Sequence, residues 1–321
     1  MAYYQLKVSI SPSKQLAVML MLISTMLLLN TGCSNQQNKA VPHLDSSAPN
    51  QKSTLDNQSE TLRIAVIPAQ GSQKQAEQLK ALAEYLEKSI GHKFDIQVQK
   101  DYDTAVNLLV TEKVQIAYLG PLTYIQAKQQ NPHIEPIVAP ITKATGRPWH
   151  TSMIIANSAR IKTVKDLPKQ RFGFVSKSST TGYLIPIVEL FDKQGINPDK
   201  DFSEVKFIGS HDKTLAALIA GEVDAVAVEQ EAYVKAQQEN KLDQSKYVKI
   251  WESTPLATAP IVVSSKLNPQ LINALKKALI DAPEGIVAVS GVETAGYTLV
   301  DDTNYQPIRQ LQAKLDAKTK K

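Results

Sequence analysis

Four consecutive hydroxyl-bearing residues at 178–181 are the strongest candidate for chemistry in the sequence. They are Ser178, Ser179, Thr180 and Thr181, and they lie between a predicted strand and a predicted helix. Hydroxyl groups donate hydrogen bonds, and the first turn of a helix adds backbone N–H groups that have no acceptor within the helix. These donors suit a tetrahedral oxyanion. An ordinary N-cap needs only one such residue, so this pattern alone leaves anion binding and simple capping open.

The sequence offers no comparable candidate for metal binding or nucleophilic catalysis. Cys33 is the single cysteine, which excludes an intrachain disulfide and a cysteine-rich metal cluster. The histidines, at positions 43, 92, 133, 150 and 211, have neither HxH nor HxxxH spacing. Neither a Gly-x-Ser-x-Gly elbow nor a Gly-x-x-x-x-Gly-Lys-Ser/Thr phosphate loop occurs. We therefore expect no metal, no other cofactor and no enzymatic activity.

The composition predicts an ordinary globular protein of about two domains. The chain has 321 residues, of which 43% are hydrophobic and 21% charged, and this length suffices for two domains of about 100 to 150 residues. Its 36 basic and 31 acidic residues give a net charge of +5. So small a charge is not typical of a nucleic-acid-binding protein.

Alternating strands and helices position these residues. The first series comprises strands over 62–67, 94–98 and 115–119 and helices over about 76–90 and 103–113. The second comprises strands over 152–156, 171–175, 205–208 and 224–228 and helices over 180–193 and 212–220. This alternation predicts parallel sheets flanked by helices. The sequence therefore contains two similar α/β units.

The remaining C-terminal elements are too few for a third core. They are a strand over 260–263, a helix that Asn268 caps and Pro269 opens, and a closing helix over about 308–317. We expect them to return and complete the first unit. The predicted domains are therefore lobe 1 over 61–145 and 255–321, and lobe 2 over 146–254.

The N-terminus has the features of an export signal. Lys7 and Lys14 precede an uncharged, mostly apolar run over 16–29, whose 14 residues fall short of the roughly 20 that a membrane-spanning helix needs. The ending Leu29-Asn30-Thr31-Gly32-Cys33 resembles the lipobox of bacterial lipoproteins, although Asn30 stands where leucine is usual. We predict a lipoprotein signal peptide over 1–32 and lipidation of Cys33; the alternative is a free thiol beside an ordinary cleavage site.

Residues 33–60 are predicted to form a lipidated tether. They are rich in Ser, Asn, Gln and Pro and contain almost no large apolar side chains, so they cannot bury enough surface to offset chain entropy. Loss of the signal removes two lysines and no acidic residue, which leaves 34 basic and 31 acidic residues. We expect an exported protein, periplasmic or on the cell surface, that a lipid holds at a membrane.

The segment 179–186, Ser-Thr-Thr-Gly-Tyr-Leu-Ile-Pro, resembles the Ser-Thr-Ser-Gly-(Tyr/Phe)-Leu-Val-Pro motif of the phosphonate/phosphite-binding proteins of ABC transporters. Further segments resemble that family in the same order. They are Ile-Ala-Tyr-Leu-Gly-Pro at 116–121, Gly-Ser-His-Asp at 209–212, Val-Asp-Ala-Val-Ala-Val at 223–228, the return crossing at 251–262, and Gly-Tyr at 296–297 with Tyr-Gln-Pro-Ile-Arg at 305–309. The resemblance spans about residues 62–312.

The resemblance implies a fold and a ligand site. The fold is a two-lobed periplasmic binding protein of type II, in which each lobe is a mixed, mostly parallel sheet flanked by helices and the ligand lies in the interlobe cleft. The implied ligand-binding residues are Tyr118, Leu119, Gly120, Ser179, Thr180, Thr181, His211 and Glu231. By this similarity the hydroxyls and amides of 179–181 and the imidazole of His211 hold the oxyanion, and residues 118–120 approach it from the other lobe. For His211, a capping or partly buried histidine is the alternative.

Several positions depart from the family pattern. Leu119 stands where relatives often have tyrosine, and Ala259 where aminophosphonate binders have aspartate. Glu231 matches a carboxylate that contacts the ligand amine in some relatives, although Glu229 takes its place under a small shift of the alignment. His150 replaces an aromatic residue and is either a wall of the pocket or a hinge residue. The oxyanion end of the site is thus kept, whereas the organic end has changed.

The predicted function is that of a substrate-binding component of an ABC transporter, which captures a phosphonate, phosphite or related phosphorus oxyanion and delivers it to a membrane permease. The alternatives are a ligand-binding input for a membrane sensor and a binding protein for phosphate or sulfate. The predicted partners are the oxyanion, the permease subunits and, through the lipid, the membrane. No nucleic acid is expected, and the protein is predicted to be a monomer.

Overall fold

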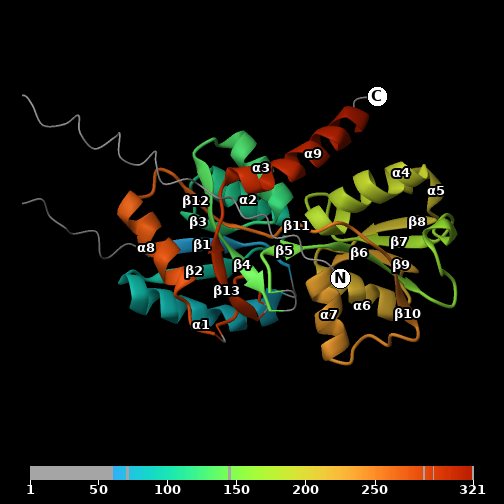
Figure 1. Ribbon diagram of the computed structural model, residues 1–321, viewed down its shortest axis with the longest axis horizontal. Coiled ribbons are helices and arrows are strands. Elements are labelled where there is room, and N and C mark those ends of the chain that lie inside the picture. The colour runs from blue at the N-terminus through green and yellow to red at the C-terminus, as the bar shows by residue number, and fades with distance from the viewer. Residues whose placement is uncertain (1–60, 70–71, 144–145, 285, 292, 320–321) are drawn as a thin grey trace, which may run out of the picture. The chain divides into compact units, whose positions relative to one another are not determined.

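Two β-sheets, each covered by helices on both faces, organise the folded part of the protein (Figure 1). The computed structural model describes residues 61–69, 72–143, 146–284, 286–291 and 293–319, all within one compact unit, Thr54–Lys321. The predicted signal peptide, Cys33 and the tether over 33–60 lie outside these residues. Among the helices described, none has the length and apolar character needed to cross a membrane.

The first sheet has the strand order β13-β4-β12-β3-β1-β2 in the described residues. Its strands are β1 (Leu62–Val66), β2 (Phe94–Val98), β3 (Ile116–Tyr118), β4 (Ile134–Thr142), β12 (Ile261–Ser264) and β13 (Thr294–Leu299). β1 pairs in parallel with β2 and β3, whereas β12 runs antiparallel between β3 and β4, and β13 is antiparallel to β4. The C-terminal strands therefore return to the sheet that the first strands begin.

In the part of the chain that the structure describes, four helices pack on this first sheet. They are α1 (Ser72–Ile90), α2 (Tyr102–Val110), α3 (Pro121–Gln130) and α8 (Pro269–Ile280). In α1, Leu79, Leu82 and Leu86 recur at helical spacing and are buried, as the sequence predicts. The predicted cap of α8 is confirmed, because the Asn268 side chain accepts a hydrogen bond from the N–H of Gln270.

The second sheet has the order β10-β6-β9-β7-β8 in the described residues. Its strands are β6 (Ser152–Asn157), β7 (Arg171–Phe174), β8 (Glu204–Phe207), β9 (Ala225–Glu229) and β10 (Tyr247–Glu252). Its helices are α4 (Asp192–Gln194), α5 (Pro198–Asp201), α6 (His211–Ile219) and α7 (Gln230–Gln238), with a short turn, η2, at Val164–Asp166. β7 pairs in parallel with β8 and β9, and β6 is antiparallel to β9 and β10. Both sheets are therefore mixed, with most of their strands pointing one way.

Two chain segments cross between the sheets. β5 (Trp149–His150) and β11 (Leu256–Ala257) pair antiparallel with each other, so that Leu256 lies opposite His150. After β13 the chain forms a short turn, η5 (Asp302–Tyr305), and the closing helix α9 (Gln306–Thr319), which contacts both α3 and the helix that begins at Thr180. The crossing strands thus bring His150 to the junction of the two halves of the fold.

The helix predicted over 180–193 is present but is wound more loosely than an α-helix. Its first two segments, η3 (Thr180–Leu184) and η4 (Pro186–Phe191), are π-helical, and α4 continues them. Pro186 has no N–H to donate to the carbonyl of Gly182 four residues earlier. That carbonyl instead accepts from the N–H of Val175, at 3.3 Å. The proline explains why this turn departs from α-helical winding.

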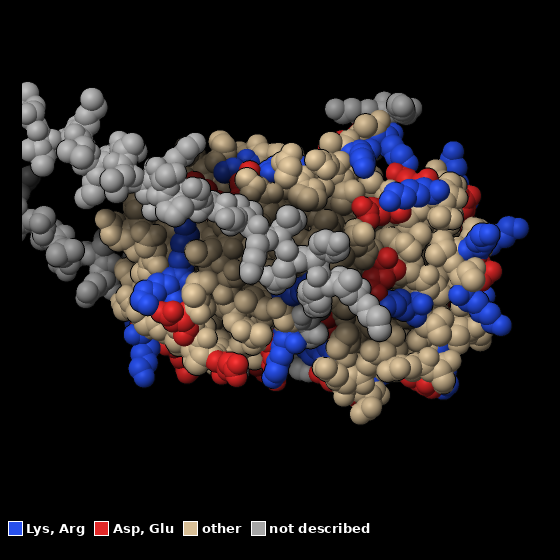
Figure 2. All heavy atoms as spheres, in the orientation of Figure 1, with Lys and Arg blue, Asp and Glu red and all other residues tan. Residues whose placement is uncertain are grey.

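Charged side chains are mixed over the face of the molecule that Figure 2 shows. Lys and Arg alternate there with Asp and Glu, and neither sign forms a continuous patch on that face. This distribution agrees with the small net charge of the chain.

Substitution of Gly182 tests how closely the helix start packs against the preceding strand. A Cβ at this position would lie 2.5 Å from Cγ2 and 2.6 Å from Cβ of Val175, closer than real Cβ contacts. We expect Gly182→Ala to lower the free energy of unfolding by about 2 kcal/mol, because the strand and the helix must move apart. In Gly120→Ala the new Cβ would find no neighbour nearer than 3.5 Å, so this control should lose far less. Urea unfolding of the ligand-free protein compares the two; equal losses would contradict the close approach at Gly182.

Candidate functional site

The start of the helix at Thr180 presents several backbone donors. Ser179 is its N-cap, and its Oγ accepts from the N–H of Gly182 at 3.0 Å. The first intrahelical hydrogen bond runs from the N–H of Leu184 to the carbonyl of Ser179, five residues earlier. An α-helix would form its first bond one residue sooner, so the π-helical start leaves one more backbone N–H without an acceptor in the helix. The amides of Thr180 and Thr181 stand in this first turn and suit an anion.

The hydroxyl residues also join the two halves of the fold. Oγ1 of Thr180 accepts from the N–H of Leu122, at 2.9 Å, in the first turn of α3. Oγ of Ser178 donates to Asp103 Oδ1 of α2, at 2.6 Å. A Cβ on Gly120 would lie 3.8 Å from Thr180 Oγ1, so Gly120 lies close to Thr180. The structure therefore brings the predicted residues of the two halves together here.

His211 begins α6 and is buried. Its Nδ1 accepts from the backbone N–H of Glu229 at 3.1 Å, which assigns the proton of the neutral ring to Nε2. Its own backbone N–H donates to the carbonyl of Ala69, at 3.3 Å, in the other half of the fold. Burial lowers the pKa of His211 to about 4. The imidazole is therefore a neutral donor at physiological pH.

Two carboxyl groups lie at the start of α7. Glu229 ends β9 and places its Oε2 3.8 Å from His211 Nε2, and Glu231 follows in the first helical turn. Burial raises the pKa of both carboxyls. The charge of Asp212 raises the pKa of Glu229 further, and the charge of Glu229 raises that of Glu231 further. Carboxylates are favoured at helix N-termini, and here they add acceptors to a site made largely of donors.

Residues 118–120 approach the same region from the end of β3. Tyr118 is buried, and burial together with the charges of Glu231 and Glu229 raises the pKa of its hydroxyl well above the ordinary value. Leu119 is fully buried and its N–H donates to the carbonyl of Pro260 at 3.2 Å. Tyr118 of the first half thus lies near the carboxyl groups of the second half.

Sequence reasoning missed two tyrosines of this region as ligand-binding candidates. Tyr102 is the first residue of α2, and its buried hydroxyl makes no hydrogen bond. Burial and the charge of Glu229 raise the pKa of this hydroxyl, whereas the nearby Ser179 side chain lowers it. The hydroxyl of Tyr297, whose proximity raises the pKa of Tyr118, is buried and also makes none. No local sequence pattern marks Tyr102. Tyr297 lies in a segment that the family resemblance covers, which was the one available signal.

His150 lies on the crossing strand β5 and is buried with its Nε2 unpartnered. Burial, reinforced by the nearby His211, lowers the pKa of His150 to about 3. His150 is thus a buried residue of a crossing strand, and its role as a pocket wall or as a hinge residue stays a prediction.

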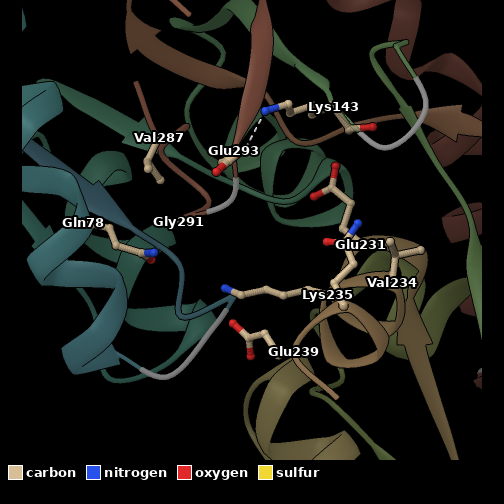
Figure 3. A pocket seen from close by; sticks show the side chains of 11 residues that line it. Gln78, Lys143, Glu231, Val234, Lys235, Glu239, Val287, Gly291 and Glu293 are labelled. Carbon is tan, nitrogen blue, oxygen red and sulfur yellow. Dashed lines mark hydrogen bonds and ion pairs between the residues drawn. The ribbon is translucent and has the colours of Figure 1, made fainter. Parts of the chain in front are cut away.

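A cavity of about 510 Å³ adjoins the cluster at Glu231. Figure 3 shows Lys235 extending into it from α7, and Lys143 paired with Glu293 on the wall near β4 and β13, at 2.7 Å. Glu231 is the one predicted site residue in its lining, which does not include residues 179–181 or His211. The cavity therefore provides a space with polar and charged lining residues next to Glu231. In the part of the chain that is described, no group of three or more His, Cys, Asp or Glu side chains could hold a metal ion.

Comparison with known sequences decides the family. Residues 64–305 match the family described as "ABC transporter, phosphonate, periplasmic substrate-binding protein". The chain belongs to this family. The predicted class of transport protein is thereby confirmed, and membership places it among periplasmic substrate-binding proteins that serve ABC transporters.

Two curated relatives of this phosphonate-binding family member cover most of the chain. The phosphate-import protein PhnD of Mycolicibacterium smegmatis is 26% identical over 234 residues, 70% of this chain and 73% of the relative. The phosphonates-binding periplasmic protein of Escherichia coli is 25% identical over 266 residues, 80% of this chain and 77% of the relative.

Solved structures confirm the fold of this family member. PhnD1 from Prochlorococcus marinus, in complex with methylphosphonate, has a TM-score of 0.71 at 20% identity and covers 80% of this chain and 98% of its own. A binding-protein component of an ABC phosphonate transporter from Pseudomonas aeruginosa has a TM-score of 0.72 at 22% identity, covering 78% and 85%. The predicted two-lobed, type II periplasmic binding protein fold is therefore correct.

The protonation of His211 gives a pH prediction. A histidine whose pKa falls from 6.5 when unfolded to about 4 when folded contributes stability above pH 6.5 that is lost as the pH falls toward 4. Glu229 and Glu231, whose pKa values are raised, act in the opposite direction, so melting alone cannot separate the groups. We expect ¹⁵N NMR to show His211 neutral, with its proton on Nε2, from pH 7.5 to 5. A midpoint near 6.5, like that of the urea-unfolded chain, would contradict the assignment.

Proposed function

We propose that this chain binds a phosphorus oxyanion between its two sheets and delivers it to the permease of an ABC transporter. The buried, unpartnered hydroxyl of Tyr102, close to Ser179 and Glu229, carries this proposal. Buried polar groups in folded proteins almost always have a hydrogen-bond partner. Tyr102 belongs to the first half of the fold and Ser179 to the second, so a ligand between them satisfies a donor that the protein leaves unpaired.

The remaining donors suit the same ligand. They are the hydroxyls and amides of residues 179–181 and the Nε2–H of His211, and residues 118–120 close the site from the other side. Neutral donors bind an oxyanion without the cost of burying a second charge. The relatives named for phosphate import and phosphonate binding, and the neighbour bound to methylphosphonate, support a phosphorus oxyanion.

We assign the lobes to the two sheets and their helices. Lobe 1 comprises 61–145 and 255–321, and lobe 2 comprises 146–254. The hydrogen bonds from Leu122 to Thr180, from Ser178 to Asp103 and from His211 to Ala69 join these lobes at the site. A ligand that contacts both lobes favours this arrangement over one in which they are apart, because only here does it gain both sets of contacts. The closed form then docks on the permease.

The organic part of the ligand extends toward Glu231. The cavity of about 510 Å³ begins at this carboxyl and carries both signs of charge in its lining. Leu119 and Ala259, where relatives have tyrosine and aspartate, are buried and carry no polar side-chain group. The cavity therefore gives a polar substituent both space and partners.

The protein acts by binding, and it acts at a membrane. The Ser179 hydroxyl accepts from Gly182, and His211 Nδ1 is occupied by the Glu229 amide, so these groups are arranged as capped binding elements and not as a nucleophile with its base. Export with removal of residues 1–32 and acylation of Cys33 would keep the protein, as a monomer, near its permease.

The first test is a ligand series on the full chain in mild detergent. Methylphosphonate, 2-aminoethylphosphonate, phosphite, phosphate and sulfate are each added at 1 mM. A ligand with a Kd of about 1 μM then stabilises the protein by about 4 kcal/mol, which raises the melting temperature by several degrees. We expect such a shift with at least one phosphorus oxyanion. Failure of all of them would overturn the proposed function.

The double variant Ser179→Ala/Thr180→Ala should weaken binding of the best ligand at least tenfold. It removes hydroxyl donors and the cap of the π-helical turn. Asn268→Ala is the matched control, because it removes the N-cap of α8 far from the site. It should cost about 1 kcal/mol of stability, less than the double variant, which also leaves the buried N–H of Leu122 unpaired, and it should leave the Kd unchanged by calorimetry. An unchanged Kd in the double variant would place the site elsewhere.

Tyr102→Phe separates binding from stability. Removal of an unpartnered buried hydroxyl should raise the stability of the ligand-free protein by about 1 kcal/mol. The same change should weaken oxyanion binding about tenfold, because a donor to the ligand is lost. The control is Tyr85→Phe, whose hydroxyl donates to the carbonyl of Ala278 at 2.7 Å and which should lose stability with its Kd intact. Tighter or equal binding by Tyr102→Phe would exclude this hydroxyl from the site.

A further inference from the structure

The cavity beside Glu231 is lined by residues from both halves of the fold. Gln78 of α1 and the residues Thr142 and Lys143, where β4 ends, line it from the first half. Residues of α7 line it from the second half, and Figure 3 shows the side chain of Lys235 extending from this helix toward the side on which Gln78 lies. A volume of about 510 Å³ is in the range of small-molecule sites, so the cavity has room for a substituent of the ligand.

Two of the acidic side chains in the lining of this cavity have a lysine partner. Oε2 of Glu293 lies 2.7 Å from Nζ of Lys143, which also lines the cavity. Oε2 of Glu239 lies 2.6 Å from Nζ of Lys241, an exposed residue two positions further along the chain. Each of these pairs brings one negative and one positive charge, so neither pair adds net charge to the cavity.

The surroundings of Glu231, the third acidic side chain of the lining, favour its neutral form. Burial and the charge of Glu229 raise the pKa of this carboxyl to about 8, although a hydrogen bond with Thr142 lowers it. At pH 7 the carboxyl therefore keeps its proton in most molecules. Lys235 is half-buried in the last turn of α7, and a lysine is a cation near neutral pH. Among the described charged residues of the lining and their lysine partners, the positive charge that remains is therefore that of Lys235.

We propose that Lys235 makes this cavity a binding site for a carboxylate on the organic part of the ligand, so that the preferred ligand is a phosphonate whose substituent ends in a carboxyl group. This inference rests on the proposed function and names its ligand class. A carboxylate beside Lys235 gains a charge-assisted hydrogen bond, which is stronger in a partly buried cavity than in water. An ammonium group at the same place would be repelled by the lysine.

The spacing along α7 sets the length of the substituent. Lys235 follows Glu231 by four residues, so it lies on the same face of the helix, about 6 Å further along its axis. On its other side Glu231 neighbours Glu229, which lies beside His211 at the oxyanion end of the site. A short carbon chain must therefore separate the phosphorus from the carboxylate, and a carboxyl group directly on phosphorus would not reach Lys235.

Matched pairs of ligands test the proposal on the full chain in mild detergent. Phosphonoacetate, 3-phosphonopropionate and 4-phosphonobutyrate are compared with ethyl-, propyl- and butylphosphonate, in which a methyl group replaces the carboxylate. Calorimetry at pH 7.5 should show that at least one carboxylate binds ten times or more as tightly as its alkyl partner. 2-Aminoethylphosphonate, which has an ammonium group in place of the carboxylate of 3-phosphonopropionate, should bind more weakly than that ligand. Added sodium chloride should reduce the advantage of the carboxylate, because salt screens the charge of the lysine.

Variants of Lys235 show whether this side chain causes the preference. Lys235→Met should reduce the ratio below threefold, because it removes the charge and keeps an unbranched side chain of similar helix propensity. Lys235→Arg keeps the charge and should keep most of the preference. The control is Lys80→Met, which removes an exposed lysine of α1 that is absent from the described lining of the cavity and should keep the wild-type ratio. Lys235→Gln replaces Lys235→Met if that variant does not fold.

The failure of this inference is distinguishable from the failure of the proposed function. Equal wild-type affinities within every pair, tighter binding of 2-aminoethylphosphonate than of 3-phosphonopropionate, or a wild-type ratio in Lys235→Met would overturn the role of Lys235 alone. Binding of methylphosphonate with rejection of every longer phosphonate would also overturn it, because the cavity would then hold no substituent. Absence of binding to the whole series and to methylphosphonate, phosphite and phosphate would instead overturn the proposed function.

Discussion

The hydrogen bond from the N–H of Leu122 to Thr180 Oγ1 fixes the geometry on which the site depends. It joins the first turn of α3, which follows β3, to the first turn of the helix that follows β7. Two more helix N-termini, those of α6 at His211 and of α7 at Glu229, lie in the same region. The N-terminus of a helix carries partial positive charge, so bringing several together is unfavourable without negative charge nearby. Glu229, Glu231 and an oxyanion can each provide it.

This constraint explains why the site does not need a cationic side chain. Oriented backbone amides and hydroxyls supply the positive potential, and burial keeps His211 and His150 neutral by lowering the pKa of each. A neutral imidazole with a fixed tautomer donates from one known atom, whereas a charged one would require a buried counterion. The carboxyl groups of Glu229 and Glu231 lie at the start of α7, where any negative charge they carry opposes the positive potential of the helix N-termini.

Local patterns in the sequence predicted the elements that carry the oxyanion end. Strand, hydroxyl run and helix follow one another at 171–194, so the short-range pattern of residues 178–181 sufficed to find the helix start. β4 was not predicted, because Pro136 and Pro140 within its nine residues are typical of strand breaks. α3 was also missed, since it is buried on nearly all sides from Pro121 to Ala127 and has no amphipathic period.

Tyr102 and the π-helical winding show why tertiary contacts limit such prediction. Tyr102 lies at the start of an ordinary amphipathic helix, and only the approach of the Ser179 turn gives its hydroxyl a role. The π-helical winding depends on Pro186, which has no N–H to donate to the Gly182 carbonyl, and on Val175, whose N–H donates to that carbonyl instead. The local sequence around Tyr102 and Pro186 is compatible with several structures. Which structure forms depends on contacts with residues far along the chain, including contacts between the two sheets.

The two departures from the family pattern at the organic end have one structural origin. The N–H of Leu119 donates to the carbonyl of Pro260, so Leu119 lies against the segment that contains Ala259. A tyrosine and an aspartate at these adjacent positions would provide a polar pair, and the leucine and alanine here form an apolar one. A change at either position alone would leave a polar group without its neighbour in a buried place, which costs free energy. Their joint replacement avoids that cost.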